Sequence, residues 1–418
     1  MRPSPLLGAL VLLAFLLRLA PLLLPFEFSG PDTVTYALPA ERLAAGEGLT
    51  DAQGRAAVSR PPGYPLFLAA IFALAGGPSW TAVRVVQAAL GAVCVLAVHR
   101  ALLPRAGERG ALLGAALVAL DPIAIGQSPF VLREQLLQTL ITLLVAALLG
   151  GGRWRHLLAG GLLVALALTH QLYALLGPFL ALSELLAARR SRTRWLRLAR
   201  WTAIGLLVAG GVLLWARRNE RGTGRLALTL ADNPVPAREL WLTATYDTWW
   251  LSGDFAAGFQ ARAWAEEAEL VERLGVEGAK AEMYRRTWAL WREHPLRSLG
   301  RLLRLNLWYW VELPGAVRLA EHPRLWAVRW ALLPWHWARL GAALLGVVWL
   351  VRSGRWRREA PALGALAFFA LAPAPLYPVP RYLGPAIPLL CGLAVGALPA
   401  ILGPRPRATS AAPRGPLP

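Results

Sequence analysis

The sequence predicts an all-α polytopic membrane protein with about ten transmembrane helices, and three observations lead to this prediction. The 418-residue chain is 56% hydrophobic and has a positive mean hydropathy, although it carries a formal net charge of +20. Many of its apolar runs approach or exceed the roughly 20 residues of helix that cross a hydrocarbon core. Its charged residues gather between these runs, whereas a soluble chain of this size would spread them over every helix.

Each long apolar run is expected to form one crossing helix. Polar Thr169, His170 and Gln171 favour two short helices over one tilted helix, because polar groups at mid-membrane are costly. Residues 64–75 are apolar but few, and we interpret them as interfacial or re-entrant. The predicted spans are 6–25, 80–103, 110–128, 134–150, 156–169, 171–187, 200–216, 338–352, 361–376 and 382–402.

Short arginine-rich segments set the direction of these crossings. Arginine and lysine in short loops favour the cytoplasmic side. With the N-terminus inside, the predicted crossings place every basic segment in the cytoplasm. These segments are 100–109, 153–155, 189–200, 352–358 and the tail after Pro404. A high pI can also indicate nucleic-acid binding, but most of the arginine clusters border apolar spans, so we expect no nucleic-acid partner.

The predicted topology divides the chain into four parts. Residues 1–216 are expected to form an N-terminal membrane module whose first outer loop is 26–60. Residues 217–337 are expected to form an outer-face interfacial helical segment, because they are rich in tryptophan and indole rings suit the headgroup level. Residues 338–403 supply the C-terminal membrane helices, and 404–418 form a disordered cytoplasmic tail.

Polar and small residues follow one another in a distinctive order along the predicted outer side. Asp32, Tyr36, Ala40 and Gly46 lie in the first outer loop, and the sequence Ser59-Arg60-Pro61-Pro62-Gly63-Tyr64-Pro65 follows. Later, Glu134 begins a predicted span, and Thr169-His170 forms a corner between two spans. Near the end, the sequence Arg381-Tyr382-Leu383-Gly384-Pro385-Ala386-Ile387-Pro388 begins the last span.

This ordered set resembles the lipid-phosphate-dependent glycosyltransferases of the GT-C class, in particular the family of protein O-mannosyltransferases and bacterial aminoarabinose transferases. The matching positions are an Asp after the first helix, a Pro-Pro-x-Tyr-Pro stretch and an Arg-Tyr-x-x-Pro-x-x-Pro pattern. The chain departs from the family at His170, where relatives usually carry Arg or Lys. The resemblance covers roughly the first half of the chain and its last three spans, as a pattern and without an alignment.

The resemblance implies an enzyme that moves a sugar from a polyprenyl-phosphate donor to an acceptor hydroxyl of a glycan, lipid or protein, with inversion. The site would face outward from the cytoplasmic membrane. The resemblance requires no cofactor and allows a divalent cation, although the sequence has no dedicated Asp-rich motif. A transporter or flippase of lipid-linked glycans and a non-catalytic membrane scaffold are the alternatives.

The predicted topology brings five ionisable residues to one side of the membrane: Asp32, Arg60, Glu134, His170 and Arg381. Cations beside a departing phosphate lower the barrier, so Arg60, Arg381 and a protonated His170 are candidates for donor-phosphate binding. A carboxylate can accept the proton of the acceptor hydroxyl, and Asp32 is the candidate base. Supporting, acceptor-side or metal-side roles are expected for Glu134, Tyr36, Tyr64 and Tyr382.

Each of these residues also has a simpler interpretation. Asp32 can cap a helix, and Glu134 can favour a helix N-terminus. Arg60 and Arg381 can be snorkelling anchors, and His170 can be a solvated turn residue. A two-carboxylate site would need Glu27 or Glu134 beside Asp32. Only the joint placement of these side chains favours the functional interpretation.

Overall fold

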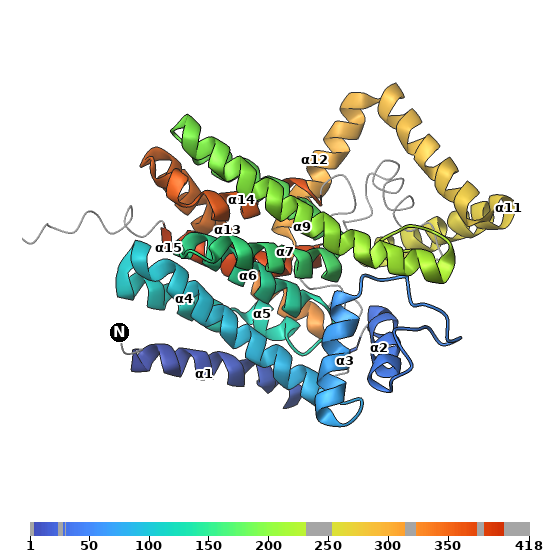
Figure 1. The fold of residues 1–418 in the computed structure, drawn as a ribbon, viewed down its shortest axis with the longest axis horizontal. Helices are drawn as coiled ribbons and strands as arrows, with labels where there is room; N and C mark the ends of the chain where they lie inside the picture. The colour runs from blue at the N-terminus through green and yellow to red at the C-terminus, as the bar shows by residue number, and fades with distance from the viewer. Residues whose placement is uncertain are drawn as a thin grey trace, which may run out of the picture.

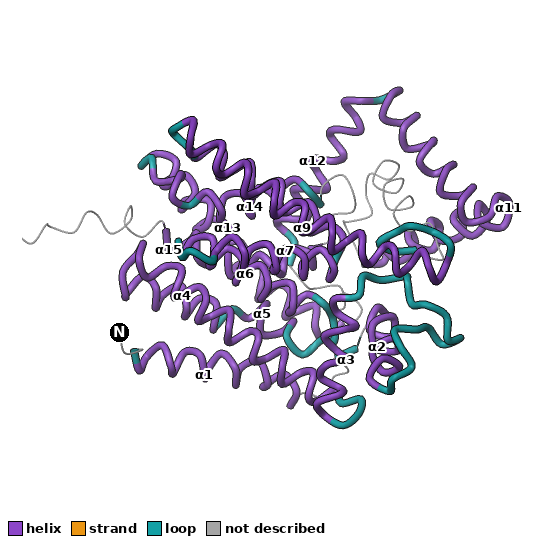
Figure 2. The backbone as a smooth tube through the Cα atoms, viewed as in Figure 1, coloured by secondary structure: helices purple, strands orange, loops and turns teal. Residues whose placement is uncertain are grey.

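The computed structural model describes residues 4–23, 28–29, 31–230, 253–313, 323–373 and 380–396. Their regular structure is helical throughout, apart from an isolated antiparallel bridge between Thr50 and Ala56 (Figures 1 and 2). The α-helices are α1 (Pro5–Leu19), α2 (Pro31–Ala44), α3 (Gly63–Ala75), α4 (Trp80–Ala119), α5 (Pro122–Gln127), α6 (Glu134–Gly150), α7 (Arg155–Thr169), α8 (Leu176–Ala187), α9 (Ser191–Thr223), α11 (Gly253–Glu293), α12 (Pro295–Val311), α13 (Pro323–Arg352), α14 (Ala360–Leu371) and α15 (Ile387–Gly396). The 3-10 helices are η1 (Ala20–Leu23), η2 (Gln171–Leu175), η4 (Arg355–Arg358) and η5 (Pro380–Ala386).

Helix α4 contains two antiparallel halves that turn back at Gly107. The backbone of Gly107 has φ +68°, in the region that favours glycine. Gly114 packs so closely on Leu102 that an added Cβ would lie 2.2 Å from the leucine Cδ1. Residues so far apart in one straight helix cannot touch at a rise of about 1.5 Å per residue. The two predicted spans 80–103 and 110–128 therefore correspond to the two halves.

The end of the second half differs from the prediction of one continuous span over 110–128. The helix stops at Ala119, and the buried Asp121 carboxylate accepts hydrogen bonds from the backbone N–H groups of Ile123 and Ala124, at 3.1 and 2.9 Å. This N-cap and Pro122 begin the separate short helix α5. The hydropathy pattern did not reveal this break, because a single polar N-cap residue lies within an otherwise apolar run.

The predicted corner at His170 is present. Helix α7 ends at Thr169, His170 is extended, and η2 and α8 follow. The predicted boundaries at 216/217 and 337/338 instead fall inside α9 and α13, which run past them. Predicted spans 361–376 and 382–402 correspond to α14 and to η5 with α15, and residues 374–379 and 397–418 lie outside the described residues.

Helix α11 projects away from the bundle, and α12 leads back to it, where Asn306 Nδ2 donates to the carbonyl oxygen of Ala370 at 3.1 Å (Figure 1). Helix α11 folds back at Gly275, whose φ is +69°, and Arg286 Nη1 then lies 2.9 Å from Glu266 Oε1. Two helical arms, before and after Gly275, thus lie within the predicted interfacial helical segment 217–337. The tryptophans at 241, 249 and 250 lie outside the described residues.

The apolar helices agree with a multi-pass membrane protein. Four described helices are long and apolar enough to cross a membrane: Pro5–Leu23, Trp80–Ala119, Ser191–Thr223 and Trp330–Arg352. Shorter apolar helices are Gly63–Ala75, Glu134–Gly150, Arg155–Thr169, Gln171–Ala187 and Ala360–Leu371. Large apolar side chains such as Leu206 and Leu214 are exposed on α9, as expected for a surface that faces lipid rather than water. The number of crossings stays a prediction.

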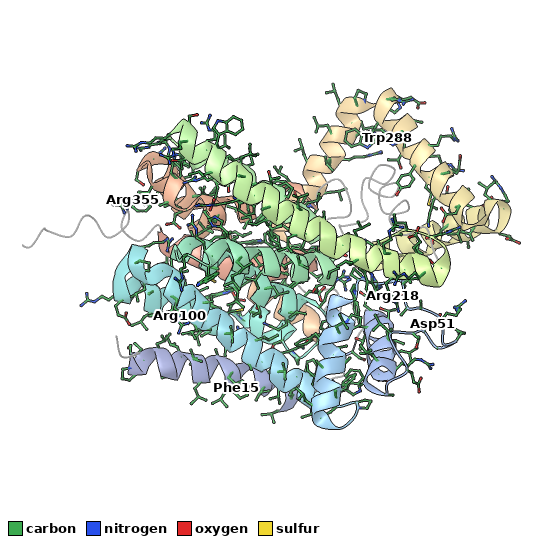
Figure 3. All side chains as sticks on the ribbon, viewed as in Figure 1. Phe15, Asp51, Arg100, Arg218, Trp288 and Arg355 are labelled. Atoms are coloured by element: carbon green, nitrogen blue, oxygen red, sulfur yellow. The ribbon has the colours of Figure 1, made fainter. Side chains whose placement is uncertain are left out.

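The bundle has two chemically different ends. The N-terminus, Arg100 and Arg355 lie toward one end, and Asp51, Arg218 and Trp288 lie toward the other (Figures 1 and 3). The first end carries basic segments that the sequence places in the cytoplasm. The second end carries α2, α3 and the loop between them, which the sequence places outside.

A buried cation ties α1 to this second end. The Arg18 side chain is 1% exposed and donates to the carbonyl oxygens of Val118 and Ala119, at 3.0 and 3.4 Å, where α4 ends. A guanidinium there satisfies carbonyls that lack helical partners and meets the negative end of the helix dipole. Gly91 makes the approach possible, because an added Cβ would lie 2.1 Å from Arg18 Nε.

Candidate functional site

Asp32 lies between two arginines that are distant in sequence. It occupies the first turn of α2, directly after Pro31, which begins the helix with a φ suited to that position. Its Oδ1 accepts a hydrogen bond from Arg60 Nη2 at 2.7 Å, and its Oδ2 accepts one from Arg381 Nη2 at 2.8 Å. Each arginine thus holds one oxygen of the same carboxylate.

The ionisation of Asp32 follows from this arrangement. Burial alone would raise the pKa of the Asp32 carboxyl, but the positive charges of Arg381 and Arg60 outweigh it and hold this pKa below its ordinary value. The side chain is 23% exposed, so it is ionised and still within reach of a ligand. Thr35 Oγ1 accepts from Arg60 Nε at 3.3 Å and helps to fix that guanidinium.

A second carboxylate joins the cluster through Arg381. Glu134 begins α6, is 8% exposed, and its Oε1 lies 3.6 Å from Arg381 Nε. Its other oxygen, Oε2, is buried without a hydrogen-bond partner. Arg381 therefore bridges two carboxylates that come from α2 and α6. Glu27, the other residue considered for such a pair, lies outside the described residues.

Arg133 is the residue that the sequence reasoning did not assign to the site. It directly precedes α6, its side chain is 5% exposed, and its guanidinium carbon lies 5.8 Å from the centre of the Tyr36 ring. Among the described residues it makes no ion pair with a carboxylate. Its position beside Glu134 in a polar stretch at a span end was the available signal, but nothing in the pattern separated it from an anchoring arginine.

His170 faces the cluster as a neutral side chain. Its Nδ1 accepts the backbone N–H of Leu172 at 3.2 Å, so the proton resides on Nε2, which is buried without a partner. Burial, together with the positive charges of Arg133, Arg381 and Arg60, holds the pKa of His170 well below its ordinary value. The cationic state considered in the sequence analysis is therefore disfavoured, and what remains is a hydrogen-bond donor.

Aromatic residues form the walls around these charges. The ring of Tyr36 meets that of Tyr64 edge-on at 5.2 Å, and the ring of Tyr382 meets that of His170 at 5.4 Å. The hydroxyl of Tyr64 donates to Gln87 Oε1 at 2.8 Å. The amide of Gln87 then donates to the carbonyl oxygens of Ser128 and Phe130. This network fixes the segment that leads into Arg133.

Gly63 explains how α3 comes so close to the His170 corner. An added Cβ at Gly63 would lie 2.4 Å from Thr169 Oγ1 and 2.8 Å from the carbonyl oxygen of Leu168. No side chain fits this contact without moving backbone. The glycine inside the Pro-Pro-x-Tyr-Pro stretch therefore allows Arg60 and His170 to share one site.

The donor set does not suit a divalent cation. Within the described part of the chain, no group of three His, Cys, Asp or Glu side chains could hold a metal ion. More directly, the two carboxylates of the cluster already bracket the guanidinium of Arg381. A divalent ion there would face three arginines and would have to displace one of them from its partners.

Comparisons with known proteins agree with the family resemblance described in the sequence analysis. The family model "Dolichyl-phosphate-mannose-protein mannosyltransferase" matches residues 59–215, which include Arg60, Arg133, Glu134 and His170. The resemblance predicted from the sequence is confirmed over this segment. No curated protein sequence matches the chain.

Solved structures share the fold. The archaeal oligosaccharyltransferase AglB from Archaeoglobus fulgidus, in complex with an inhibitory peptide and a dolichol-phosphate, matches with a TM-score of 0.53 and 14% identity over 95% of this chain and 50% of that one. The structure of the same oligosaccharyltransferase in complex with Zn and sulfate has a TM-score of 0.53 and 12% sequence identity. This match covers 95% of this chain and 49% of the oligosaccharyltransferase. ArnT from Cupriavidus metallidurans bound to undecaprenyl phosphate has a TM-score of 0.42 and 17% sequence identity. This match covers 94% of this chain and 78% of ArnT. The chain thus shares the helical fold of the membrane part of the oligosaccharyltransferase structures and spans about half the length of that protein.

Proposed function

We propose that this chain is a GT-C membrane glycosyltransferase that transfers a sugar from a polyprenyl-phosphate donor to an acceptor hydroxyl of a glycan, lipid or protein. The reaction would take place at the outer face of the cytoplasmic membrane. The observation that carries the proposal is the convergence of Asp32, Arg60 and Arg381 beside the buried Arg133, which has no acidic partner among the described residues.

The charge of the site suits a monophosphate donor. The guanidinium groups of Arg60, Arg133 and Arg381 and the carboxylates of Asp32 and Glu134 together leave one positive charge. A polyprenyl-phosphate sugar is a phosphodiester with one negative charge, so donor and site neutralise each other. Buried charges require such compensation.

The charges of the site and the bound phosphate also neutralise each other after the reaction. The acceptor hydroxyl gives its proton to a carboxylate oxygen of Asp32 as its oxygen bonds to the anomeric carbon. The bond from that carbon to the phosphate oxygen breaks, and its electron pair stays on the phosphate. The product phosphate then carries two negative charges while the site, with Asp32 protonated, carries two positive ones. A direct displacement of this kind inverts the anomeric centre.

Donor binding is expected to activate Asp32. A carboxylate held by two arginines is a weak base, because those charges stabilise its ionised form. A donor phosphate that takes over the hydrogen bond from Arg60 or from Arg381 would release one Asp32 oxygen toward the acceptor. Tyr36, Tyr64 and Tyr382 would line the donor and acceptor sides, and the Nε2–H of His170 would donate to a phosphate or sugar oxygen.

The test compares purified Asp32→Asn with Asp51→Asn, which changes a more exposed carboxylate of the same loop. Both variants are given a polyprenyl-phosphate sugar and an acceptor in detergent, and released polyprenyl phosphate and glycosylated acceptor are measured. Asp32→Asn should lower the rate by about 10²–10⁴-fold, as expected for loss of a general base, and Asp51→Asn should not.

Undiminished turnover by Asp32→Asn would remove this residue from the mechanism. A wild-type protein that binds the donor but leaves it intact in detergent would instead support a transporter, because transport needs two compartments and consumes no donor. A protein that neither binds nor consumes the donor would support a scaffold.

A further inference from the structure

A cavity of about 710 Å³ lies at the basic end of the bundle, away from the Asp32 cluster. Its apolar walls come from α4, α6 and α15 and include Val98, Val145 and Leu393. Its rim carries Arg355, Arg357 and Arg358 of η4, between α13 and α14. A pocket of this size falls in the range of about 300–1,000 Å³ that holds small ligands, and it joins an apolar interior to a cationic rim.

The three rim arginines are available to a ligand. Each is exposed, and among the described residues none of the three makes a hydrogen bond or an ion pair with a carboxylate. Arg355 and Arg357 lie over the rings of Trp349 and Trp356, at 4.9 and 5.3 Å, which orients the guanidinium groups without neutralising them.

The neighbouring Arg105 differs from the three rim arginines because it has partners within the protein. It also lines the cavity, but its Nε donates to Glu359 Oε1 at 2.8 Å and its Nη2 donates to the carbonyl oxygen of Leu149 at 2.7 Å. Its charge is therefore compensated within the protein. Arg155 of α7 and Arg197 of α9 also line the cavity, and they donate to the carbonyl oxygens of Leu148 and Glu184. Among the described lining arginines, those of η4 make no such bonds.

We propose that this cavity binds one anionic phospholipid of the surrounding membrane. The headgroup phosphate is held by Arg355, Arg357 and Arg358, and an acyl chain lies between α4, α6 and α15. Charge complementarity selects an anionic headgroup, and the apolar depth behind the rim selects a molecule with a hydrocarbon chain over a free anion. The bound lipid fills the space between α4, α6 and α15 at this end and so stabilises their packing.

Two kinds of variant distinguish binding of the lipid headgroup from binding of the lipid acyl chain. The double variant Arg355→Gln/Arg358→Gln removes rim charge, and Arg100→Gln/Arg192→Gln removes the same charge from exposed residues outside the cavity. Gly392 lines the cavity, and an added Cβ there meets nothing within 4 Å. Gly392→Leu therefore fills the acyl region and leaves every arginine in place.

The full-length protein and these variants are reconstituted with equal parts phosphatidylglycerol and phosphatidylcholine, extracted in detergent, and analysed by native mass spectrometry. Wild type should retain one phosphatidylglycerol per chain after washing. Arg355→Gln/Arg358→Gln should weaken retention about 30-fold, because about 1 kcal/mol per arginine at a lipid surface gives about 2 kcal/mol for the pair. Gly392→Leu should also lose the lipid, and Arg100→Gln/Arg192→Gln should retain it.

Several results would overturn the proposal. Equal loss in both double variants would mean that bulk charge alone attracts lipid, and equal retention of phosphatidylcholine would remove the headgroup role. Displacement of the lipid by inorganic phosphate would assign the rim to free anions. Lipid retention only by a chain ending at Gly403 would assign the cavity to the C-terminal residues of the chain itself.

Discussion

The two ends of the bundle use arginine in opposite ways. At the end that carries the Asp32 cluster, Arg60, Arg133 and Arg381 come from three distant segments, and two of them are held by the carboxylate of Asp32. At the other end, Arg355, Arg357 and Arg358 come from one short turn and remain exposed. The comparison teaches that a cation cluster built from distant segments requires compensating carboxylates and fixed geometry. A cluster built from neighbouring residues can rely on water or lipid for compensation.

Among the variants that compare the two ends, the largest effect is expected from removing Arg133, the arginine of the Asp32 cluster that has no acidic partner among the described residues. Arg133→Gln should lower kcat/KM for a polyprenyl-phosphate sugar by about 10²–10³-fold, because a preorganised charge beside the leaving phosphate is lost. Arg100→Gln, at the opposite end, is the charge-matched control and should leave the rate unchanged (Figure 3).

Steady-state kinetics in detergent, with the melting temperature as a folding check, measure this difference. Because Arg133 has no described acidic partner to leave uncompensated, the variant should fold. Equal rates for Arg133→Gln and Arg100→Gln would mean that the two ends do not differ in their catalytic use of charge.

A smaller effect is expected from Gly63, which tests whether the Asp32 cluster depends on the close packing of α3 against the His170 corner. Gly63→Ala forces a Cβ against the backbone of Leu168 and should destabilise the protein by about 1–3 kcal/mol, the usual cost of overpacking. Gly161→Ala in α7 is the control, because an added Cβ there meets nothing within 4 Å. It should be neutral or slightly stabilising, since alanine favours helix more than glycine does.

Thermal unfolding in detergent measures the stability changes of Gly63→Ala and Gly161→Ala. A Gly63→Ala protein that melts with wild type would show that α3 can move away from the corner. In that case the close approach of Arg60 and His170 would not depend on this glycine.

The smallest effect concerns pH and the buried His170. Its folded pKa lies below the unfolded value of about 6.5, so below that pH the unfolded chain binds more protons and folding stability falls. Above about pH 6.5 the contribution is fully present; near pH 5 the loss should reach at most about 2 kcal/mol.

Melting temperatures measured between these pH values should fall less steeply for His170→Gln than for wild type. His294→Gln changes an exposed histidine and should keep the wild-type slope. An unchanged slope for His170→Gln would show that this side chain is not held neutral among the arginines.

Much of the candidate site could be predicted from the sequence, because the positions of polar residues at the ends of apolar runs are a local signal. The direction of the crossings placed Asp32, Arg60, Glu134, His170 and Arg381 on one side, and these residues do form one cluster. The charge state of His170 was beyond this reasoning, because it depends on burial and on cations from other segments. Arg133 was missed for the same reason, since an anchoring arginine and a buried one look alike in sequence.

The sequence by itself determined the helical membrane architecture, the two different ends and the identity of most polar residues of the Asp32 cluster. These follow from hydropathy and loop charge, which are properties of contiguous residues. Only the tertiary structure decided which arginine neutralises which carboxylate, where α4 turns, and that a cavity opens beneath Arg355 and Arg358. Those outcomes depend on distances between residues that the chain brings together from far apart, and no local pattern encodes such distances.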